Sequence, residues 1–169
     1  KQDLELAIES LLKLGIIEKA SEDGLLRSSN ESLMDARLRC SSKGFCFAIR
    51  DDGGDDVYIR DHQLNHAWNG DRVLVRITRE GGRRRSPEGG VQCILERSTR
   101  SLLAQVERQD EQMLAAPLDD RMLTTIVLPE EASAHLSGDP PENVVEVSID
   151  RYPVAQHPAE GHVVRPLPL

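Results

Sequence analysis

Two short runs of alternating side chains, joined by a turn that no helix tolerates, most constrain the fold of this chain. The runs cover residues 44–50 and 55–60, and residues 51–54 between them read Asp-Asp-Gly-Gly. Alternation with a period of two places successive side chains on opposite faces of a strand. Asp and Gly favour turns, because Asp hydrogen-bonds nearby backbone and Gly adopts positive φ at no steric cost. The sequence therefore predicts a hairpin of two strands here.

Similar strand-and-turn patterns recur along most of the chain. Five strands are predicted in the first unit, at residues 35–40, 44–50, 55–60, 72–77 and 91–95, with a short helical or irregular crossover at 61–68. The second unit repeats the plan, at residues 102–106, 113–116, 124–128, 144–149 and 161–164. A Gly-Asp pair, Gly70-Asp71 or Gly138-Asp139, accompanies the same long connection in each unit. Five short strands in about 65 residues are typical of a small closed barrel of the oligonucleotide-binding (OB) type, so we predict two tandem barrels.

The first residues follow a different pattern. Apolar side chains at helical spacing predict an amphipathic helix over residues 3–14, and residues 16–20 and 25–27 predict a β-hairpin. A helix followed by a hairpin is the second half of a winged helix. The helix is acidic, which phosphate would repel, so we favour a packing module over a groove-binding helix. Residues 28–32 are interpreted as a linker, and the start on Lys1 indicates a fragment of a longer protein.

The predicted fold class is therefore mainly β, with a partial winged helix before two barrels. The domain boundaries that we expect are residues 1–32 for the winged-helix segment and linker, 33–97 for the first barrel and 98–169 for the second. No apolar run approaches the roughly 20 residues that a membrane-spanning helix needs. The three cysteines, Cys40, Cys46 and Cys93, lack metal-ligand spacing. We expect reduced thiols in a cytoplasmic protein, and neither a disulfide nor a zinc site.

The net charge of −8 argues against a nucleic-acid partner until its distribution is considered. Residues 72–100 hold eight arginines against three glutamates, whereas residues 101–169 hold four arginines against twelve acidic residues. The average therefore conceals a basic segment in the middle of the chain, next to an acidic end.

Alternation also gathers most of the few aromatic side chains on one face. Phe45 and Phe47 share a face of one strand, and Tyr58 and Arg60 share a face of the next. If the small and β-branched residues point inward, the outer face presents three aromatic rings beside a cation. Stacking one base on such a ring contributes roughly 1–3 kcal/mol. The residues alone are equally consistent with a second reading, in which both phenylalanines belong to the core.

The same two strands resemble the paired ribonucleoprotein motifs of cold-shock domains. The matching segments are Lys-Gly-Phe-Cys-Phe-Ala-Ile at residues 43–49 and Val-Tyr-Ile-Arg at 57–60. In that family the aromatic residues at these positions lie on the outer face and stack on single-stranded bases. Three positions depart from the family pattern: Leu38 stands in place of Trp, Cys46 in place of Gly and Arg60 in place of His. The departures imply that one stacking platform is lost and that the affinity of this barrel alone is modest.

Further segments resemble the tandem cold-shock domains of bacterial ribonuclease R and ribonuclease II. They are residues 69–77, 93–97, 151–153 and 158–164, in that order. This resemblance implies the N-terminal RNA-binding region of a 3′-to-5′ exoribonuclease, a hydrolase of RNA degradation. It also implies a magnesium-dependent catalytic domain with clustered aspartates beyond Leu169. The expected partners are single-stranded RNA, which this region would capture and guide, and the protein's own catalytic domain.

The candidate RNA-binding residues are the basic and aromatic side chains on and around this face. They are Arg37, Arg39, Lys43, Phe45, Phe47, Tyr58, Arg60, Trp68, Arg72, Arg83, Arg84 and Arg85. The cations would hold phosphates without reading sequence. For the three arginines at 83–85 the alternative is a solvated loop, because glycines flank them. The second barrel lacks the aromatic platform, so we expect it to bind RNA weakly and to close a channel or contact the catalytic domain.

We expect no catalytic residue, metal ion or cofactor in this chain. The paired acids at residues 51–52, 55–56 and 119–120 are interpreted as solvated turns, and the five histidines have no nucleophile at a recognisable spacing. We also expect a monomer without membrane contact. The competing hypothesis is a protein-interaction or regulatory scaffold built on OB barrels, which the net charge and the bare second barrel favour.

Overall fold

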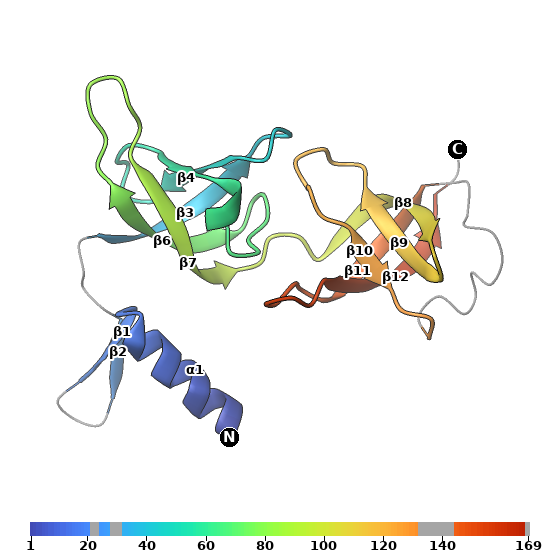
Figure 1. Ribbon diagram of the computed structural model, residues 1–169, viewed down its shortest axis with the longest axis horizontal. Helices are drawn as coiled ribbons and strands as arrows, with labels where there is room; N and C mark the ends of the chain where they lie inside the picture. Colours follow the sequence, from blue (N-terminus) through green and yellow to red (C-terminus); the bar gives the residue numbers. More distant parts are fainter. Residues whose placement is uncertain (21–23, 28–31, 132–143, 168–169) are drawn as a thin grey trace.

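A computed structural model of the chain describes residues 1–20, 24–27, 32–131 and 144–167. The chain begins with α1 (Gln2–Lys13), β1 (Ile17–Lys19) and β2 (Leu25–Arg27), followed by two barrels side by side along the long axis (Figure 1). The second predicted Gly-Asp pair, Gly138-Asp139, and most of the predicted linker at 28–32 lie outside the described residues.

The N-terminal helix and hairpin form as predicted. β1 and β2 pair antiparallel, with Ile17 opposite Arg27, and α1 lies beside them (Figure 1). Arg76 of the first barrel donates from Nη2 to the carbonyl oxygen of Leu14 at 2.8 Å, which ties this module to the first barrel. No helix in the described part of the chain is long and apolar enough to cross a membrane.

Five strands close the first barrel: β3 (Leu33–Cys40), β4 (Cys46–Arg50), β5 (Val57–Ile59), β6 (Arg72–Arg79) and β7 (Glu88–Glu96). They pair in the order β3-β4-β5-β7-β6, with β6 returning to β3, and β5 and β7 run parallel. A short 3₁₀ helix, η1 (Asp61–Gln63), begins the predicted crossover. β6 ends at residue 79 rather than 77, and β7 begins at 88 rather than 91. The two strands of this hairpin are therefore longer than predicted, and the loop that joins them is shorter.

The second barrel repeats this topology with β8 (Ser101–Gln109), β9 (Gln112–Pro117), β10 (Ile126–Leu128), β11 (Val145–Arg151) and β12 (Ala159–Pro166). β10 and β12 run parallel, as β5 and β7 do in the first barrel. Gly89 of β7 and Gly161 of β12 meet the same constraint in the two barrels. A Cβ at Gly89 would collide with the carbonyl oxygen of Arg76, and one at Gly161 with that of Ser148. The prediction of two tandem five-stranded OB barrels is confirmed.

The core of the first barrel consists of small and β-branched side chains on alternate positions. The inward residues of β4 and β5 are Cys46, Ala48, Val57 and Ile59, each 2% exposed or less. Because these positions point inward, the intervening side chains of both strands must point outward. The reading in which Phe45 and Phe47 fill the core is therefore wrong.

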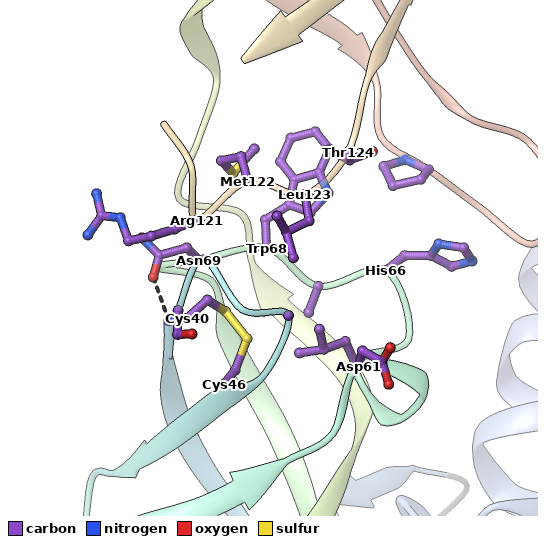
Figure 2. Close-up of a pocket in the computed structure, with 15 residues that line it drawn as sticks. Cys40, Cys46, Asp61, His66, Trp68, Asn69, Arg121, Met122, Leu123 and Thr124 are labelled. Atoms are coloured by element: carbon purple, nitrogen blue, oxygen red, sulfur yellow. Dashed lines mark hydrogen bonds between the residues drawn. A yellow bond between two sulfur atoms is a disulfide. The ribbon is translucent and has the colours of Figure 1, made fainter. Parts of the chain in front are cut away.

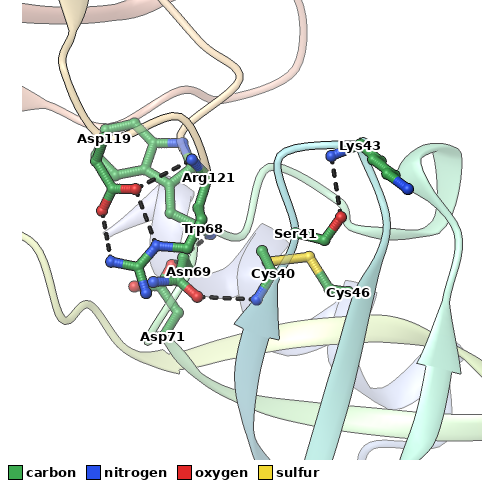
Figure 3. Close-up of a disulfide and its surroundings, with 9 residues drawn as sticks. All are labelled: Cys40, Ser41, Lys43, Cys46, Trp68, Asn69, Asp71, Asp119 and Arg121. Carbon is green, nitrogen blue, oxygen red and sulfur yellow. Dashed lines mark hydrogen bonds and ion pairs between the residues drawn. A yellow bond between two sulfur atoms is a disulfide. The ribbon is translucent and has the colours of Figure 1, made fainter.

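Cys40 and Cys46 form a disulfide, so the prediction of reduced thiols is wrong for this pair (Figure 3). The two residues are direct partners across β3 and β4, with Cα atoms 4.0 Å apart. Direct partners in an antiparallel ladder lie close enough for sulfur atoms to bond. The spacing of six residues did not indicate this, because it becomes informative only when the register of the hairpin is known.

A candidate nucleic-acid interface on the first barrel

Three rings gather on the outer face of β4 and β5, and we call Phe45, Phe47 and Tyr58 the aromatic surface. The centroid of Tyr58 lies 5.6 Å from that of Phe45 and 5.5 Å from that of Phe47, and the two phenylalanine centroids are 6.1 Å apart. Each ring therefore contacts the other two. All three remain partly exposed, so ring faces are accessible while the neighbouring contacts hold the side chains in place.

Strand register places a cation directly beside the aromatic surface. Arg39 of β3 is the partner of Phe47, and Phe47 is in turn the partner of Tyr58. Arg39 is exposed, as is Lys43 at the turn before β4. This arrangement places ring faces and cationic groups along one line across three strands. A single-stranded nucleic acid presents bases that can stack on the rings and phosphates that can contact the cations.

Two further candidates on this side already have protein partners. Arg37 donates from Nη1 to the carbonyl oxygen of Gly70 at 2.9 Å. Arg72 donates to the carboxylate of Asp51 at 2.6 Å and lies 3.9 Å from that of Asp35. Arg37 and Arg72 are partners across β3 and β6, so they extend the basic edge beyond Arg39. Their contacts limit how freely they can turn towards a ligand.

At the opposite edge, two arginines converge on one carboxylate. Glu88 is the partner of Tyr58 across the parallel strands β5 and β7. Its Oε1 atom lies 3.3 Å from Nη2 of Arg60 and 3.1 Å from Nη2 of Arg79. The Arg60 guanidinium also lies over the Tyr58 ring, 5.8 Å from its centroid. Arg79 was missed by the sequence analysis, because the predicted strand ended two residues before it.

The arginines at 83–85 lie in the loop that joins β6 to β7 and projects from the first barrel (Figure 1). Gly82 and Arg85 pair as an isolated antiparallel bridge, so the tip of this loop is a turn. All three arginines are exposed. The structure places them beyond the edge formed by Arg79 and Glu88, and does not bring them onto the aromatic surface.

Trp68 does not join the aromatic surface. Its side chain is only 6% exposed and belongs to the core of the second barrel, although the residue lies between β5 and β6 of the first. The guanidinium of Arg97 lies 5.3 Å from the Trp68 centroid and 4.6 Å from that of Tyr152. The two rings are themselves 5.5 Å apart. Trp68 therefore connects the two barrels, and its ring is not available to a base.

Asp71 holds the Trp68 and Arg97 segments together, a role that its place in the predicted Gly-Asp repeat did not indicate. The residue is fully buried. Its carboxylate accepts hydrogen bonds from the backbone N–H of Trp68 at 2.8 Å and of Ser98 at 2.9 Å, and from Arg97 at 3.0 Å. A buried carboxylate with an arginine partner and further donors is well satisfied. We call Trp68, Asp71, Arg97 and Tyr152 the inter-barrel joint.

A cavity of about 370 Å³ lies beside the joint. Figure 2 shows the Cys40–Cys46 disulfide on one side and Met122 and Leu123 of the second barrel on the other. Asn69 accepts a hydrogen bond from the backbone N–H of Cys40 at 2.8 Å, which holds the crossover against β3 (Figure 3). The cavity thus separates the two barrels on one side of the inter-barrel joint.

The acidic turns are held by arginines of their own strand or turn. Arg50 donates to Asp52 at 2.8 Å, and this hydrogen bond lowers the pKa of the Asp52 carboxyl group. Arg121 does the same for Asp119, whose pKa is also lowered chiefly by that hydrogen bond (Figure 3). In the part of the chain that the structure describes, no three His, Cys, Asp or Glu side chains gather in a group that could hold a metal ion.

Comparisons with known proteins match the first barrel with a family model and nearly the whole chain with curated relatives. A family model described as the ribonuclease B OB domain matches residues 36–94. Over 166 residues the chain is 47% identical to the acetazolamide conferring resistance protein zam of Synechocystis sp., a match that covers 97% of this chain and 21% of that protein. It is 25% identical to ribonuclease R of Aquifex aeolicus, covering 99% of this chain and 22% of that protein. The chain thus spans about a fifth of the length of these relatives.

The fold is also found in a solved structure. Mycoplasma genitalium RNase R, in complex with ribose methylated single-stranded RNA, superposes with a TM-score of 0.66 at 16% sequence identity. The match covers 79% of this chain and 21% of that one. At this identity the match establishes a shared fold.

Proposed function

We propose that the first barrel binds single-stranded RNA on the aromatic surface. The premise is that this chain is the OB region of a ribonuclease R/II family protein. The observation that carries the proposal is the row formed by Arg39, Phe47 and Tyr58 across three neighbouring strands. It joins stacking faces to a cation without an intervening acidic side chain. The complex of Mycoplasma genitalium RNase R with single-stranded RNA supports RNA as the partner.

The row of Arg39, Phe47 and Tyr58 should favour single-stranded over double-stranded RNA. Bases stacked inside a duplex cannot reach a ring on a barrel surface, whereas an unpaired strand can splay its bases onto it. Each stacked base contributes roughly 1–3 kcal/mol, and each phosphate that a cation neutralises makes binding weaker at higher salt. A short strand crossing β3, β4 and β5 would meet Arg39 and Lys43 at one edge and Arg60 at the other.

The role within the longer protein is part of the same proposal. We infer that the first barrel captures RNA and guides it to a catalytic domain outside this chain, in a cytoplasmic 3′-to-5′ exoribonuclease. We assign the expected Mg²⁺ to that catalytic domain as part of the same proposal. The acidic second barrel, whose one aromatic residue is Tyr152 in the joint, would position the first barrel rather than hold bases.

Fluorescence anisotropy of a labelled short oligouridylate tests the RNA proposal. We expect wild-type chain to bind at low salt and to bind more weakly when salt rises from about 50 to about 200 mM. The double variant Phe47→Ala with Tyr58→Ala removes two stacking faces and should weaken binding by at least about tenfold. Leu103→Ala, an exposed apolar truncation on the second barrel, is the matched control and should change little.

Two results would contradict the proposal. One is the absence of binding by folded wild-type chain at low salt, which would favour the scaffold hypothesis. The other is equal binding by the wild type and the double aromatic variant, which would move any RNA site away from the aromatic surface.

A further inference from the structure

The cluster of Arg60, Arg79 and Glu88 differs from an ordinary surface ion pair in its geometry. Two guanidinium groups from different parts of the chain, one following β5 and one ending β6, approach a single oxygen atom at 3.3 and 3.1 Å. The arginine side chains are about half exposed, at 54% and 50%, while that of Glu88 is 21% exposed. The cluster therefore consists of two exposed cationic groups that share one carboxylate of the protein itself.

Strand register fixes this cluster at the edge of the aromatic surface. Glu88 is the partner of both Tyr58 on β5 and Arg79 on β6. The hydroxyl of Thr78 donates to the Glu88 carbonyl at 3.3 Å, and the backbone N–H of Tyr58 donates to the Pro87 carbonyl at 2.8 Å. These contacts position the backbone around the cluster. The cluster therefore lies next to Tyr58, on the side of the aromatic surface opposite Phe47.

We propose that Arg60 and Arg79 form a phosphate-binding site for a single-stranded RNA backbone, and that Glu88 occupies this site in the free protein as an internal competitor. The inference rests on the proposed function and adds to it a new contact residue, Arg79, and a residue that limits affinity. Carboxylates and phosphates satisfy the same guanidinium donors, so one can replace the other. RNA binding then exchanges the Glu88 contacts for phosphate contacts.

The exchange is physically favourable for a polyanion. Exposed ion pairs of this kind contribute little in water, so their loss is a small cost. A phosphate bound by Arg60 and Arg79 is covalently linked to a base that can stack on Tyr58, so stacking adds to its binding free energy. The Glu88 carboxylate gains no such stacking. Glu88 remains close by after displacement, however, and its charge repels the phosphate. Removing that charge should therefore strengthen RNA binding, although Glu88 makes two contacts that would ordinarily be described as stabilising.

The decisive variant is Glu88→Gln, which keeps the shape and the accepting oxygen and removes the charge. We expect it to bind a short oligouridylate about fivefold more tightly than wild type at low salt, with a steeper dependence on salt. Glu146→Gln is the matched control: Glu146 pairs with Arg165 at 2.8 Å on the second barrel, so the substitution also removes one negative charge and one arginine pair. It should raise affinity far less.

The role of Arg79 is tested separately. Arg79→Ala should weaken binding and reduce the salt slope by about 0.7, the value for one phosphate contact on a single strand. Its matched control is Arg165→Ala. The increase in RNA affinity caused by Glu88→Gln should be smaller when Arg79 is also replaced, because only Arg60 is then left to bind the phosphate. Thermal unfolding of each variant verifies that the barrels are folded.

The outcomes separate this inference from the proposed function. If wild type binds RNA through the aromatic surface but Glu88→Gln gains no more than Glu146→Gln, the phosphate site is wrong and the function stands. If only Glu88→Gln binds, Glu88 blocks the phosphate site, and the proposed function is wrong for the wild-type chain. If neither folded protein binds RNA, both proposals are wrong.

Discussion

Replacing Trp68 by Ala should destabilise the second barrel, although the residue belongs to the chain segment of the first. The Trp68 ring lies in the second core, beside Tyr152 and Arg97, whereas the first core consists of other residues. The backbone N–H of Trp68 would still donate to Asp71, so the crossover itself should keep its path. The substitution therefore removes the Trp68 ring from the second core and leaves the first barrel almost unperturbed.

The magnitude follows from burial. Truncating a buried Trp or Phe to Ala costs about 3–5 kcal/mol, and this range already includes the ring contacts that are lost. Trp68 is only 6% exposed, so we expect a cost in the upper half of this range. The loss also removes one of the two ring faces that enclose the Arg97 guanidinium, 5.3 Å from the Trp68 centroid. That cation then stays beside Asp71 in a more hydrated site.

Hydrogen exchange at increasing urea, measured by mass spectrometry, would locate the effect. In Trp68→Ala we expect peptides from β8 to β12 to lose protection at lower urea, with peptides from β3 to β7 nearly unchanged. Leu38→Ala, in the first core, should give the reverse pattern at about 2–5 kcal/mol. Equal loss of protection in both barrels of Trp68→Ala, or loss confined to the first, would refute the joint as described.

Two further predictions concern the hairpins of the first barrel. Reduction of the Cys40–Cys46 disulfide, or the double variant Cys40→Ser with Cys46→Ser, should lower the free energy of unfolding by about 2 kcal/mol, as expected for a short closed loop; denaturant titration with and without reductant measures this, and an unchanged midpoint would contradict it. The lowered pKa of Asp52 means that its contact with Arg50 contributes stability above the ordinary aspartate pKa, and that this contribution is lost as pH falls through the lowered value. Melting temperatures of wild type and Asp52→Asn should therefore converge in acid, whereas a constant difference down to strongly acidic pH would contradict the assignment.

The barrels were predictable because their signals are local. Alternation along residues 44–50 and 55–60 fixes which side chains share a face, and the Gly-rich turn between them fixes a hairpin. Closure into a barrel followed from the number and length of the strands. The same local rule placed Phe45, Phe47 and Tyr58 together once the small residues were assigned to the interior.

The features that the sequence did not reveal depend on register or on tertiary contact. Cys40 and Cys46 become partners only in one register of β3 and β4. Glu88 meets Tyr58 through a parallel pairing between strands distant in sequence. Trp68 lies in a crossover, where no periodicity indicates which core receives the ring. Asp71 directly precedes β6, where no periodicity indicates that its carboxylate is buried.

The central claim, that RNA lies on the aromatic surface, is tested most directly by photo-crosslinking. A short single-stranded RNA carrying 5-iodouridine reacts with aromatic side chains on which its base stacks, and mass spectrometry locates the attached nucleotide. We predict that crosslinks fall within residues 43–60, on Phe45, Phe47 or Tyr58, and disappear when an unlabelled single strand is added in excess. Crosslinks confined to α1 or to the second barrel, with residues 43–60 unmodified, would contradict the account.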